Sequence, residues 1–329
     1  MDWKNQTILV TGAGGFIGSQ LVEALLAEGA RVRAFVRYNS RGDPGMLRLL
    51  PAELADRLEV IPGDLRDRQA IFDAARDCGL VFHLGALISI PYSYRHPYEV
   101  AEVNFMGTLN MLMACRELGI PRLIHTSTSE VYGTARRAPI DEEHPLQGQS
   151  PYSASKIGAD KMAESFYCAY NLPVVTVRPF NTFGPRQSTR AVIPTITTQA
   201  LVNNTVHLGN LDTTRDFTFV SDTVRGFMAA AATAGVEGGV FNLGTGQEIR
   251  IGEIAERIAH KVGKSVKIEV DAHRLRPEKS EVLRLISDNR LAREKLGWSP
   301  QVSLDEGLDR TIEWIRQHMD QFKPGRYEF

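Results

Sequence analysis

The sequence predicts an α/β fold in which a doubly wound parallel sheet of the Rossmann type is joined to a smaller C-terminal α/β lobe. Three observations indicate this fold. Short apolar strands alternate with helical patterns through the first half of the chain, a glycine-rich turn joins the first strand to the first helix, and the alternation weakens after Arg178. At 329 residues the chain is also longer than a typical single-core domain.

The predicted elements follow one another in a regular order. Thr7–Thr11 is a β-branched run, residues 19–28 repeat apolar side chains at helical spacing, Gly29 ends that helix, and residues 31–36 supply the next strand. Further strands are expected at 58–61, 80–84, 122–127, 174–178 and 239–243. Helices are expected at about 67–78, 98–119 and 152–170, and later at 251–262 and 304–319.

This order predicts two parts. Because consecutive βαβ units build one sheet, residues 1–178 are expected to form a Rossmann cofactor-binding domain, to which a segment near 215–245 returns. Residues 179–329 are expected to form mainly the second lobe, with loops rich in proline, threonine and asparagine.

The composition excludes several classes of partner. The 38 basic and 39 acidic residues give a net charge of −1, so no overall field favours nucleic acid or an anionic membrane. The three cysteines are widely spaced and suggest neither a disulfide framework nor a metal site. The N-terminus runs directly into a strand, and no stretch approaches the roughly 20 apolar residues of a membrane span. We expect a cytoplasmic protein.

A glycine motif predicts a dinucleotide site. GAGGFIG at 12–18 has the spacing GxxGxxG and lies between the first strand and the first helix. Gly12 permits the turn, Gly15 lets backbone amides approach a pyrophosphate, and Gly18 lets the helix pack on the sheet. The cofactor-binding residues predicted here are Gly12, Gly15, Phe16, Ile17 and Gly18.

Other strand ends add to this site. Asp64 is expected to accept a hydrogen bond from the adenine amino group and Leu65 to pack on the ring, while the chain around Leu84 and Ala86 lets the dinucleotide lie close to the backbone. Arg37 stands where NAD-specific folds carry an acidic residue. A guanidinium there can pair with a 2′-phosphate, which favours NADP(H), although it could also stack on adenine and leave NAD acceptable.

A second motif predicts the chemistry. Tyr152 and Lys156 form YxxxK at the start of a helix, which places the two side chains one turn apart on the same face. A nearby ammonium lowers the pKa of a phenol, so Tyr152 is expected to be the base that deprotonates a sugar hydroxyl. Both residues are also expected to contact the cofactor.

The segments TGAGGFIG, GDLRD, HLGA, TSTSEVYG, YSASK, RPFNTFGPR and RDFTFVSD resemble the extended short-chain dehydrogenase/reductase family over essentially the whole chain. The resemblance implies a C-terminal lobe for a nucleotide diphosphate sugar and a tightly bound NAD(P) that is reduced and reoxidised in one turnover. It also implies a homodimer, or a tetramer built from dimers, through the helices near 98–119 and 152–170.

The resemblance also assigns roles on the substrate side. It implies that Thr128 hydrogen-bonds the sugar near O4 alongside Tyr152 and that Asn181 and Arg190 bind the substrate. Arg215 and Arg276 are similar to arginines that neutralise the diphosphate.

Thr128-Ser129-Glu130 favours a 4,6-dehydratase within this family. A C4 ketone acidifies the C5 proton; Glu130 can then remove it while a hydroxyl group of this motif helps the C6 hydroxyl to leave, and hydride returns to C6. Which group is the acid at C6 stays open, and Ser129 is one of the predicted catalytic residues. GDP-mannose 4,6-dehydratases show a similar Thr-Ser-Glu, as do dehydratases of UDP- or GDP-N-acetylglucosamine in legionaminate-type pathways, whereas many glucose-nucleotide dehydratases carry Asp where this chain has Ser129. Residues 36–41 and 178–195 resemble the N-acetylglucosamine group most, which predicts that substrate.

Three alternatives stay open. UDP-glucuronate decarboxylases can also read Ser-Glu before Val-Tyr, and Arg215 could serve a substrate carboxylate as well as a diphosphate. A nucleotide-sugar 4-epimerase would need only hydride transfer at C4. A non-catalytic NAD(P)-binding sensor on the same fold is a distant alternative, because Thr128, Tyr152 and Lys156 are all intact.

Overall fold

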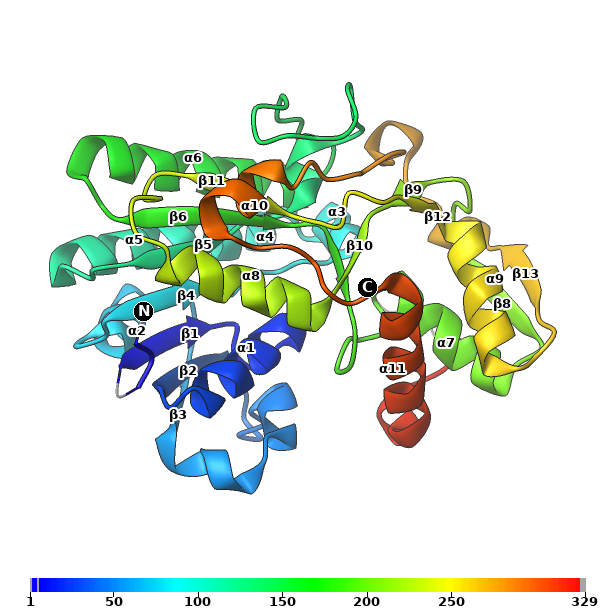
Figure 1. Cartoon of the computed structure of the whole chain (residues 1–329), viewed down its shortest axis with the longest axis horizontal. Helices are drawn as coiled ribbons and strands as arrows, with labels where there is room; N and C mark the ends of the chain where they lie inside the picture. The colour runs from blue at the N-terminus through cyan, green and yellow to red at the C-terminus, as the bar shows by residue number, and fades with distance from the viewer. Residues whose placement is uncertain (1, 5, 326–329) are drawn as a thin grey trace.

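The computed structural model describes residues 2–4 and 6–325, and it confirms the predicted fold class (Figure 1). A parallel sheet of seven strands forms the larger part, in the order β11-β6-β5-β4-β1-β2-β3. Its strands are β1 (Thr7–Thr11), β2 (Arg31–Arg37), β3 (Leu58–Gly63), β4 (Leu80–His83), β5 (Leu123–Thr126), β6 (Val174–Pro179) and β11 (Val240–Leu243).

The strand order sets the place of the site. β1 lies in the middle and pairs with β2 on one side and β4 on the other, with Thr11 opposite both Phe35 and His83. The direction of winding reverses between β1 and β4, and open α/β sheets bind ligands outside the carboxyl ends of their strands at this point.

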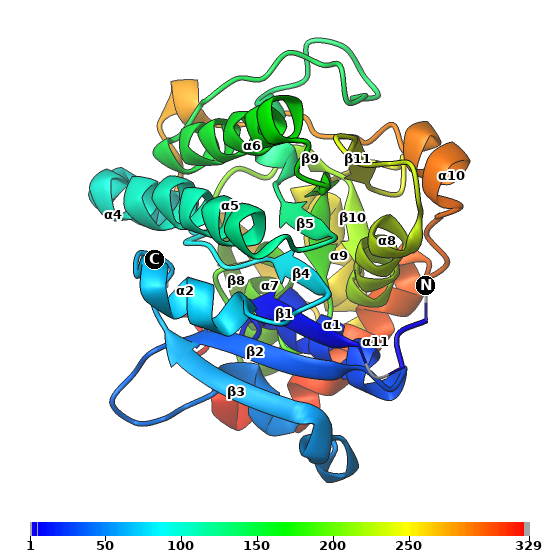
Figure 2. The same ribbon diagram turned by 90° about the vertical axis from the view of Figure 1, so that its left-hand side faces the viewer.

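Helices cover both faces of this sheet (Figure 2). α1 and α8 lie on one face, and α2, α5 and α6 lie on the other. Their bounds are α1 (Phe16–Ala27), α2 (Arg68–Ala75), α5 (Gly107–Leu118), α6 (Pro151–Tyr170) and α8 (Val220–Ala232). The helix expected at 98–119 is continuous but is made of α4 (Pro97–Ala101), a π-helical turn (Glu102–Met106) and α5. A short helix, α3 (Ile90–Arg95), precedes it.

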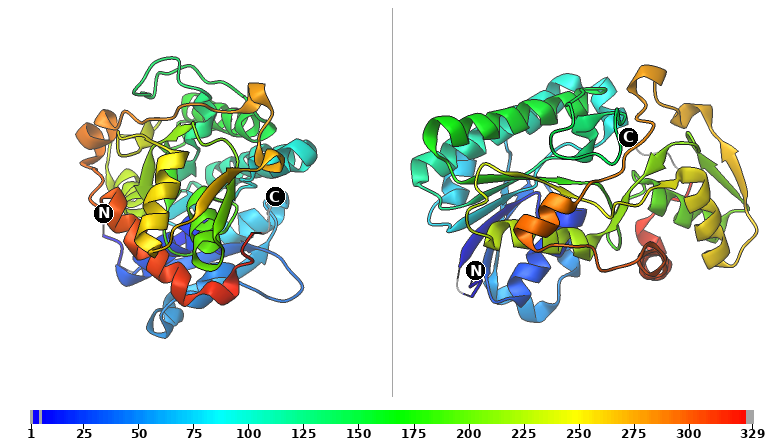
Figure 3. Two further views of the ribbon diagram at one scale, coloured as in Figure 1. Left: turned by 90° about the vertical axis from the view of Figure 1, so that its right-hand side faces the viewer. Right: turned by 45° about the horizontal axis from the view of Figure 1, so that its top comes forward.

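The chain leaves the main sheet after β6 and returns with β11. The segments outside the sheet form a smaller part with three two-stranded sheets, β7/β10, β9/β12 and β8/β13 (Figure 3). These strands are β7 (Asn181–Phe183), β8 (Thr205–Leu208), β9 (Thr214–Arg215), β10 (Phe217–Phe219), β12 (Ile249–Arg250) and β13 (Lys267–Val270). The remaining helices are α7 (Val192–Val202), α9 (Ile251–Val262), α10 (Arg290–Leu296) and α11 (Leu304–Gln317).

Sequence analysis predicted α9 and α11, which the structure confirms, but it missed the short strands, α7 and α10. These strands have two to four residues, which is too short to show an alternating pattern. α7 (VIPTITTQALV) is rich in β-branched residues, which have low intrinsic helix propensity, so tertiary packing decides its conformation. In the described residues no helix has both the length and the apolar character that crossing a membrane requires.

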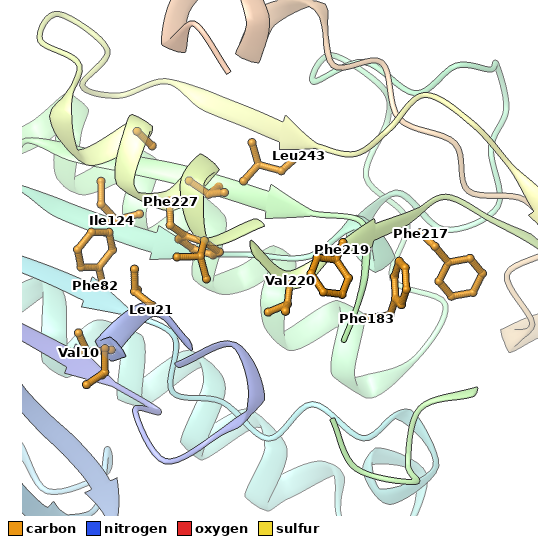
Figure 4. Close-up of a cluster of buried hydrophobic side chains, with 14 of the residues drawn as sticks. Val10, Leu21, Phe82, Ile124, Phe183, Phe217, Phe219, Val220, Phe227 and Leu243 are labelled. Atoms are coloured by element: carbon orange, nitrogen blue, oxygen red, sulfur yellow. The ribbon is translucent and has the colours of Figure 1, made fainter. Parts of the chain in front are cut away.

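One apolar core runs from the main sheet into the smaller part (Figure 4). Val10 and Phe82 lie at one end, and three phenylalanines continue the core toward the smaller part. The Phe183 ring packs edge-to-face on Phe217 and Phe219, with centroid distances of 6.1 and 5.6 Å. Because the core is continuous, it fixes the smaller part against the carboxyl ends of the sheet.

We predict that Phe183→Ala lowers the free energy of unfolding by about 3–5 kcal/mol, because Phe183 is 1% exposed and its loss leaves a cavity at this junction. Val202→Ala is the matched control, since Val202 is 52% exposed and should change stability by less than about 0.5 kcal/mol. Urea unfolding measures both. Equal effects of the two substitutions would contradict this account of the core.

Candidate active site

A cleft of about 870 Å³ opens at the carboxyl ends of the central strands. Its walls come from the loops after β1, β2, β4 and β5 on one side and from the smaller part on the other. The predicted site residues that line it are Gly12, Gly15, Phe16, Ile17, Gly18, Arg37, Leu84, Ala86, Thr128, Glu130, Tyr152, Asn181, Arg190, Arg215 and Arg276. The predicted residues outside its lining are Asp64, Leu65, Ser129 and Lys156.

The glycine turn has the shape that a dinucleotide needs. Gly12 has a φ of +67°, and a Cβ at this position would lie 2.8 Å from the backbone nitrogen of Gly85, so only glycine fits. The N-cap of α1 is Gly15, and no side chain caps this helix end. The amide groups of the first turn and the positive end of the helix dipole are therefore available for a pyrophosphate.

A loop after β2 forms a further wall that sequence analysis did not identify. Asn39 organises it by donating to the carbonyl of Asp43 (2.8 Å) and accepting from the amide of Asp43 (3.0 Å). The amide of Met46 donates to the carbonyl of Gly14 (2.9 Å), which ties the loop to the glycine turn. Asn39 and Asp43 both line the cleft.

Asp64 and Leu65, which are predicted to contact the adenine, are not among the residues that line the cleft. Asp64 is engaged by the guanidinium of Arg66, with an Oδ2–Nη2 distance of 2.6 Å, and this hydrogen bond lowers the pKa of the carboxyl group. Leu65 is buried in the apolar cluster under α2 and α5. The structure therefore places both residues beside the lining of the cleft and not in it.

Tyr152, the predicted base, is positioned by the start of α6. Ser150 caps the helix, and its hydroxyl oxygen accepts from the amide of Ser153 (3.1 Å) while the Ser153 hydroxyl oxygen accepts from the amide of Ser150 (2.9 Å). The first turn thus holds Tyr152 near the end of β5, where burial raises the pKa of its phenol and the side chain of Thr128 lowers it. Burial raises the pKa of Tyr152, so the phenol needs nearby positive charge to act as a base.

Lys156 supplies a positive charge from below the cleft. Its Nζ donates to the carbonyl of Thr126 at 2.7 Å, and the side chain is buried one turn after Tyr152. Burial lowers the pKa of Lys156 to about 8, whereas the carboxylate of Asp160, one turn further on, raises it. The carboxylate of Asp160 also raises the pKa of Tyr152.

Asp160 is the centre of a buried polar network. Its carboxylate accepts from Nη2 of Arg178 (2.9 Å) and the hydroxyl of Ser127 (2.7 Å), and it lies 3.0 Å from Nε2 of His125. Nη1 of Arg178 donates to the Tyr132 hydroxyl (2.9 Å). Burial lowers the pKa of His125 and of its stacked neighbour His83, which favours their neutral forms. Arg178 and Lys156 against Asp160 leave one net positive charge in this network. On Tyr152 itself, burial raises the pKa most, and the charges of Glu130 and Asp160 raise it further.

Thr128, Ser129 and Glu130 occupy different environments although they are consecutive. Thr128 and Glu130 line the cleft, and the amide of Glu130 donates to the Thr128 hydroxyl oxygen (3.2 Å). Burial raises the pKa of Tyr152, and the negative charge of Glu130 adds to this rise. Burial lowers the pKa of Arg215, and the charge of Glu130 opposes that shift. Ser129 is buried and is not among the residues that line the cleft.

The opposite wall carries the arginines. Arg215 is buried on β9, donates from Nη1 to the carbonyl of Thr214 (2.9 Å), and lies 3.7 Å from Glu281, which is also 3.7 Å from Arg276. Arg276 Nη1 and Asn181 Oδ1 are buried without a hydrogen-bond partner within the described structure. Such atoms suit a polar ligand, because an unpaired buried polar atom is costly.

Comparison with known proteins assigns the family. A family profile described as GDP-mannose 4,6 dehydratase matches residues 9–311. A UDP-glucose 4-epimerase of Mycolicibacterium smegmatis is 37% identical over 94% of this chain and 98% of its own length. A crystal structure of a dTDP-glucose 4,6-dehydratase from Streptomyces venezuelae with NAD bound has a TM-score of 0.88 and 30% identity, covering 97% of this chain and 99% of that one.

A UDP-glucose 4-epimerase from Thermotoga maritima, solved with UDP-glucose, is similar at a TM-score of 0.87 and 30% identity, covering 95% of this chain and all of that one. The chain therefore belongs to the extended short-chain dehydrogenase/reductase family, as the motifs predicted. Within that family it groups with enzymes that modify nucleotide sugars as 4,6-dehydratases or 4-epimerases.

The buried network generates a prediction about pH. The Tyr152/Lys156 pair can remove a substrate proton only after the pair has lost one of its own protons. Since the Asp160 carboxylate raises the pKa of both groups, Asp160→Asn should move the rise of kcat/KM with pH to lower pH, by about one unit. The measurement is kcat/KM for nucleotide-sugar turnover as a function of pH.

Ser127→Ala is the matched control, because it removes one hydrogen bond to Asp160 and keeps the charge. It should lower stability by about 1 kcal/mol and leave the position of the pH profile unchanged. Superimposable profiles for Asp160→Asn and the wild type would contradict the electrostatic role of Asp160.

Proposed function

We propose that the chain is a nucleotide-sugar 4,6-dehydratase that converts a nucleotide-linked N-acetylglucosamine to the 4-keto-6-deoxy sugar. The observation that carries this proposal is the position of Glu130. Its carboxylate lines the cleft beside Tyr152 and Thr128, close enough to raise the pKa of Tyr152. A second base next to the first is needed for elimination, whereas hydride transfer at C4 needs only one.

In this mechanism Tyr152 accepts the proton of the sugar O4 hydroxyl while Thr128 fixes that hydroxyl by hydrogen bonding. Lys156 and the net positive network beneath it stabilise the tyrosinate. Glu130 then removes the proton from C5, which the C4 ketone has acidified. The carboxyl group formed in this way can pass the proton to the C6 hydroxyl as it departs as water, a step for which buried Ser129 is not required.

We propose NAD as the resident cofactor, which supplies the hydride acceptor and donor when bound. The glycine turn and the uncapped start of α1 fit its pyrophosphate, and the Streptomyces venezuelae relative carries NAD. This replaces the preference for NADP(H) that Arg37 suggested. We assign cofactor binding mainly to residues 1–178 with the segment near 215–245, and nucleotide-sugar binding mainly to the rest of 179–329.

The assignment of an N-acetyl group to the substrate sugar rests on the resemblance of two segments to N-acetylglucosamine dehydratases. The two segments that resemble N-acetylglucosamine dehydratases, 36–41 and 178–195, both contribute to the cleft wall, through residues such as Asn39 and Gln187. For the diphosphate, we propose Arg215 and Arg276, with Asn181 and Arg190 as further substrate contacts.

A 4-epimerase is the second candidate, because the Mycolicibacterium smegmatis relative has that name. An epimerase would leave the sugar mass unchanged and would not need Glu130. A uronate decarboxylase needs a cation for the substrate carboxylate. Arg215 could serve that carboxylate as well as a diphosphate, so it does not separate the two reactions. The presence of Thr128, Tyr152 and Lys156 in one constellation argues against a non-catalytic sensor.

We predict that Glu130→Gln reduces loss of water by about 10²–10⁴-fold, because the amide keeps the size of the side chain and cannot accept the C5 proton. A panel of nucleotide sugars analysed by mass spectrometry measures the product. Glu281→Gln is the control in the same cleft; it removes a carboxylate that lies 3.7 Å from both Arg215 and Arg276, so it should lower KM and still yield dehydrated product. Wild-type rates of dehydration by Glu130→Gln would contradict the assignment.

We also propose a homodimer formed by the helices of 98–119 and 152–170. Large apolar side chains are exposed on them, including Tyr98, Met106 and Tyr170, and such residues are typical of interfaces. Sedimentation at micromolar concentration should detect a dimer or a tetramer, and Tyr98→Asp should weaken the association. A strictly monomeric wild type would contradict this proposal.

A further inference from the structure

A charged cluster lies at the end of the cleft where β2 finishes. Nη2 of Arg37 is 3.4 Å from Oε1 of Glu99, and the second oxygen of Glu99 accepts from the Tyr92 hydroxyl. The Glu99 side chain is 25% exposed, whereas that of Arg37 is 70% exposed. The carboxylate is therefore the fixed partner of this pair and the guanidinium the mobile one.

Three further residues complete the cluster. Arg66 lies 2.6 Å from Asp64 and 3.7 Å from Glu102, and the charge of Glu99 also raises the pKa of Arg66. Arg37 in turn contributes to the lowered pKa of Asp64. Two guanidinium groups thus face three carboxylates, and the charge of a third guanidinium, that of Arg190, also acts on the Tyr92 hydroxyl group that donates to Glu99.

The position of this cluster gives it a consequence for cofactor choice. In a Rossmann fold the residue at the end of the second strand lies beside the adenosine ribose 2′ position, and here that residue is Arg37. A free arginine there would attract a 2′-phosphate. Here the carboxylate of Glu99 lies beside that arginine and offsets its charge. A carboxylate at this place repels the 2′-phosphate, which carries up to two negative charges, and can accept a hydrogen bond from a neutral 2′-hydroxyl.

We propose that Glu99 is the residue that makes the cofactor site select NAD over NADP. It takes the role that an acidic residue at the end of the second strand has in other dinucleotide-binding folds, although it stands on α4, 62 residues later in the sequence. Arg37, which alone would favour NADP, is thereby converted into a neutral part of the ribose pocket.

The test measures cofactor binding without any sugar substrate. Purified protein is incubated with equal concentrations of NAD and NADP until the bound composition is constant, free cofactor is removed, and the released cofactor is quantified by mass spectrometry. The wild type should hold mainly NAD. Glu99→Gln should shift the bound NADP:NAD ratio toward NADP by roughly tenfold, the effect of one close like charge.

Two further variants separate the charge from other effects. Glu99→Asp keeps the charge and should retain the preference for NAD, and the double variant Arg37→Ala/Glu99→Gln restores the net charge of the cluster and should return the ratio toward the wild-type value. Glu117→Gln, whose carboxylate pairs with Arg68 at 2.6 Å, is the control outside the cluster.

A wild type that holds at least as much NADP as NAD would overturn the proposal, as would an unchanged ratio in Glu99→Gln. The inference rests on the proposed cofactor site and not on the reaction. Because no sugar is present in the binding experiment, a negative result there would not affect the choice between dehydratase and epimerase. Conversely, if the dehydratase proposal failed, the expected ratio of bound NADP to NAD would stay the same.

Discussion

The buried ion pair between Asp160 and Arg178 is the interaction on which the rest of the site depends. It joins α6, which carries Tyr152 and Lys156, to β6. Asp160 also contacts His125, which lies in β5, and Ser127, which directly follows this strand. Buried charges need such partners, since an unpaired one costs several kcal/mol. The network therefore fixes the helix against the sheet and at the same time sets the charge beneath Tyr152.

The two walls of the cleft present different groups, one set suited to the cofactor and hydride transfer and the other to the substrate. The main sheet presents a glycine turn and the tyrosine–lysine pair, while the smaller part presents arginines that suit a diphosphate. The continuous apolar core through Phe183 holds these walls at a constant spacing. Glu130 lines the cleft near Tyr152, and we propose that it adds a second base to a site whose hydride transfer needs only one.

Much of this could be predicted from sequence because the signals are local. The glycine motif and YxxxK each place their residues within one turn, so Gly12, Tyr152 and Lys156 could be named before the structure. Ser129 could not be placed, because whether the middle residue of a three-residue motif faces a cleft depends on the 3₁₀ turn Ser129–Tyr132. Glu99 and Asp160 were missed since their partners are distant in sequence, although the spacing of Asp160 from Lys156 was a usable signal. The short strands of the smaller part carry no periodic pattern.

The central claim is that the cleft performs elimination across C5 and C6. Incubation of the wild-type enzyme with UDP-N-acetylglucosamine in deuterium oxide tests it most directly, with the product analysed by mass spectrometry and NMR. We expect a product that has lost the elements of water and carries solvent deuterium at C5, because the proton removed there leaves with the departing hydroxyl and is replaced from solvent. A product of unchanged composition with no deuterium at C5 would contradict the account and identify an epimerase.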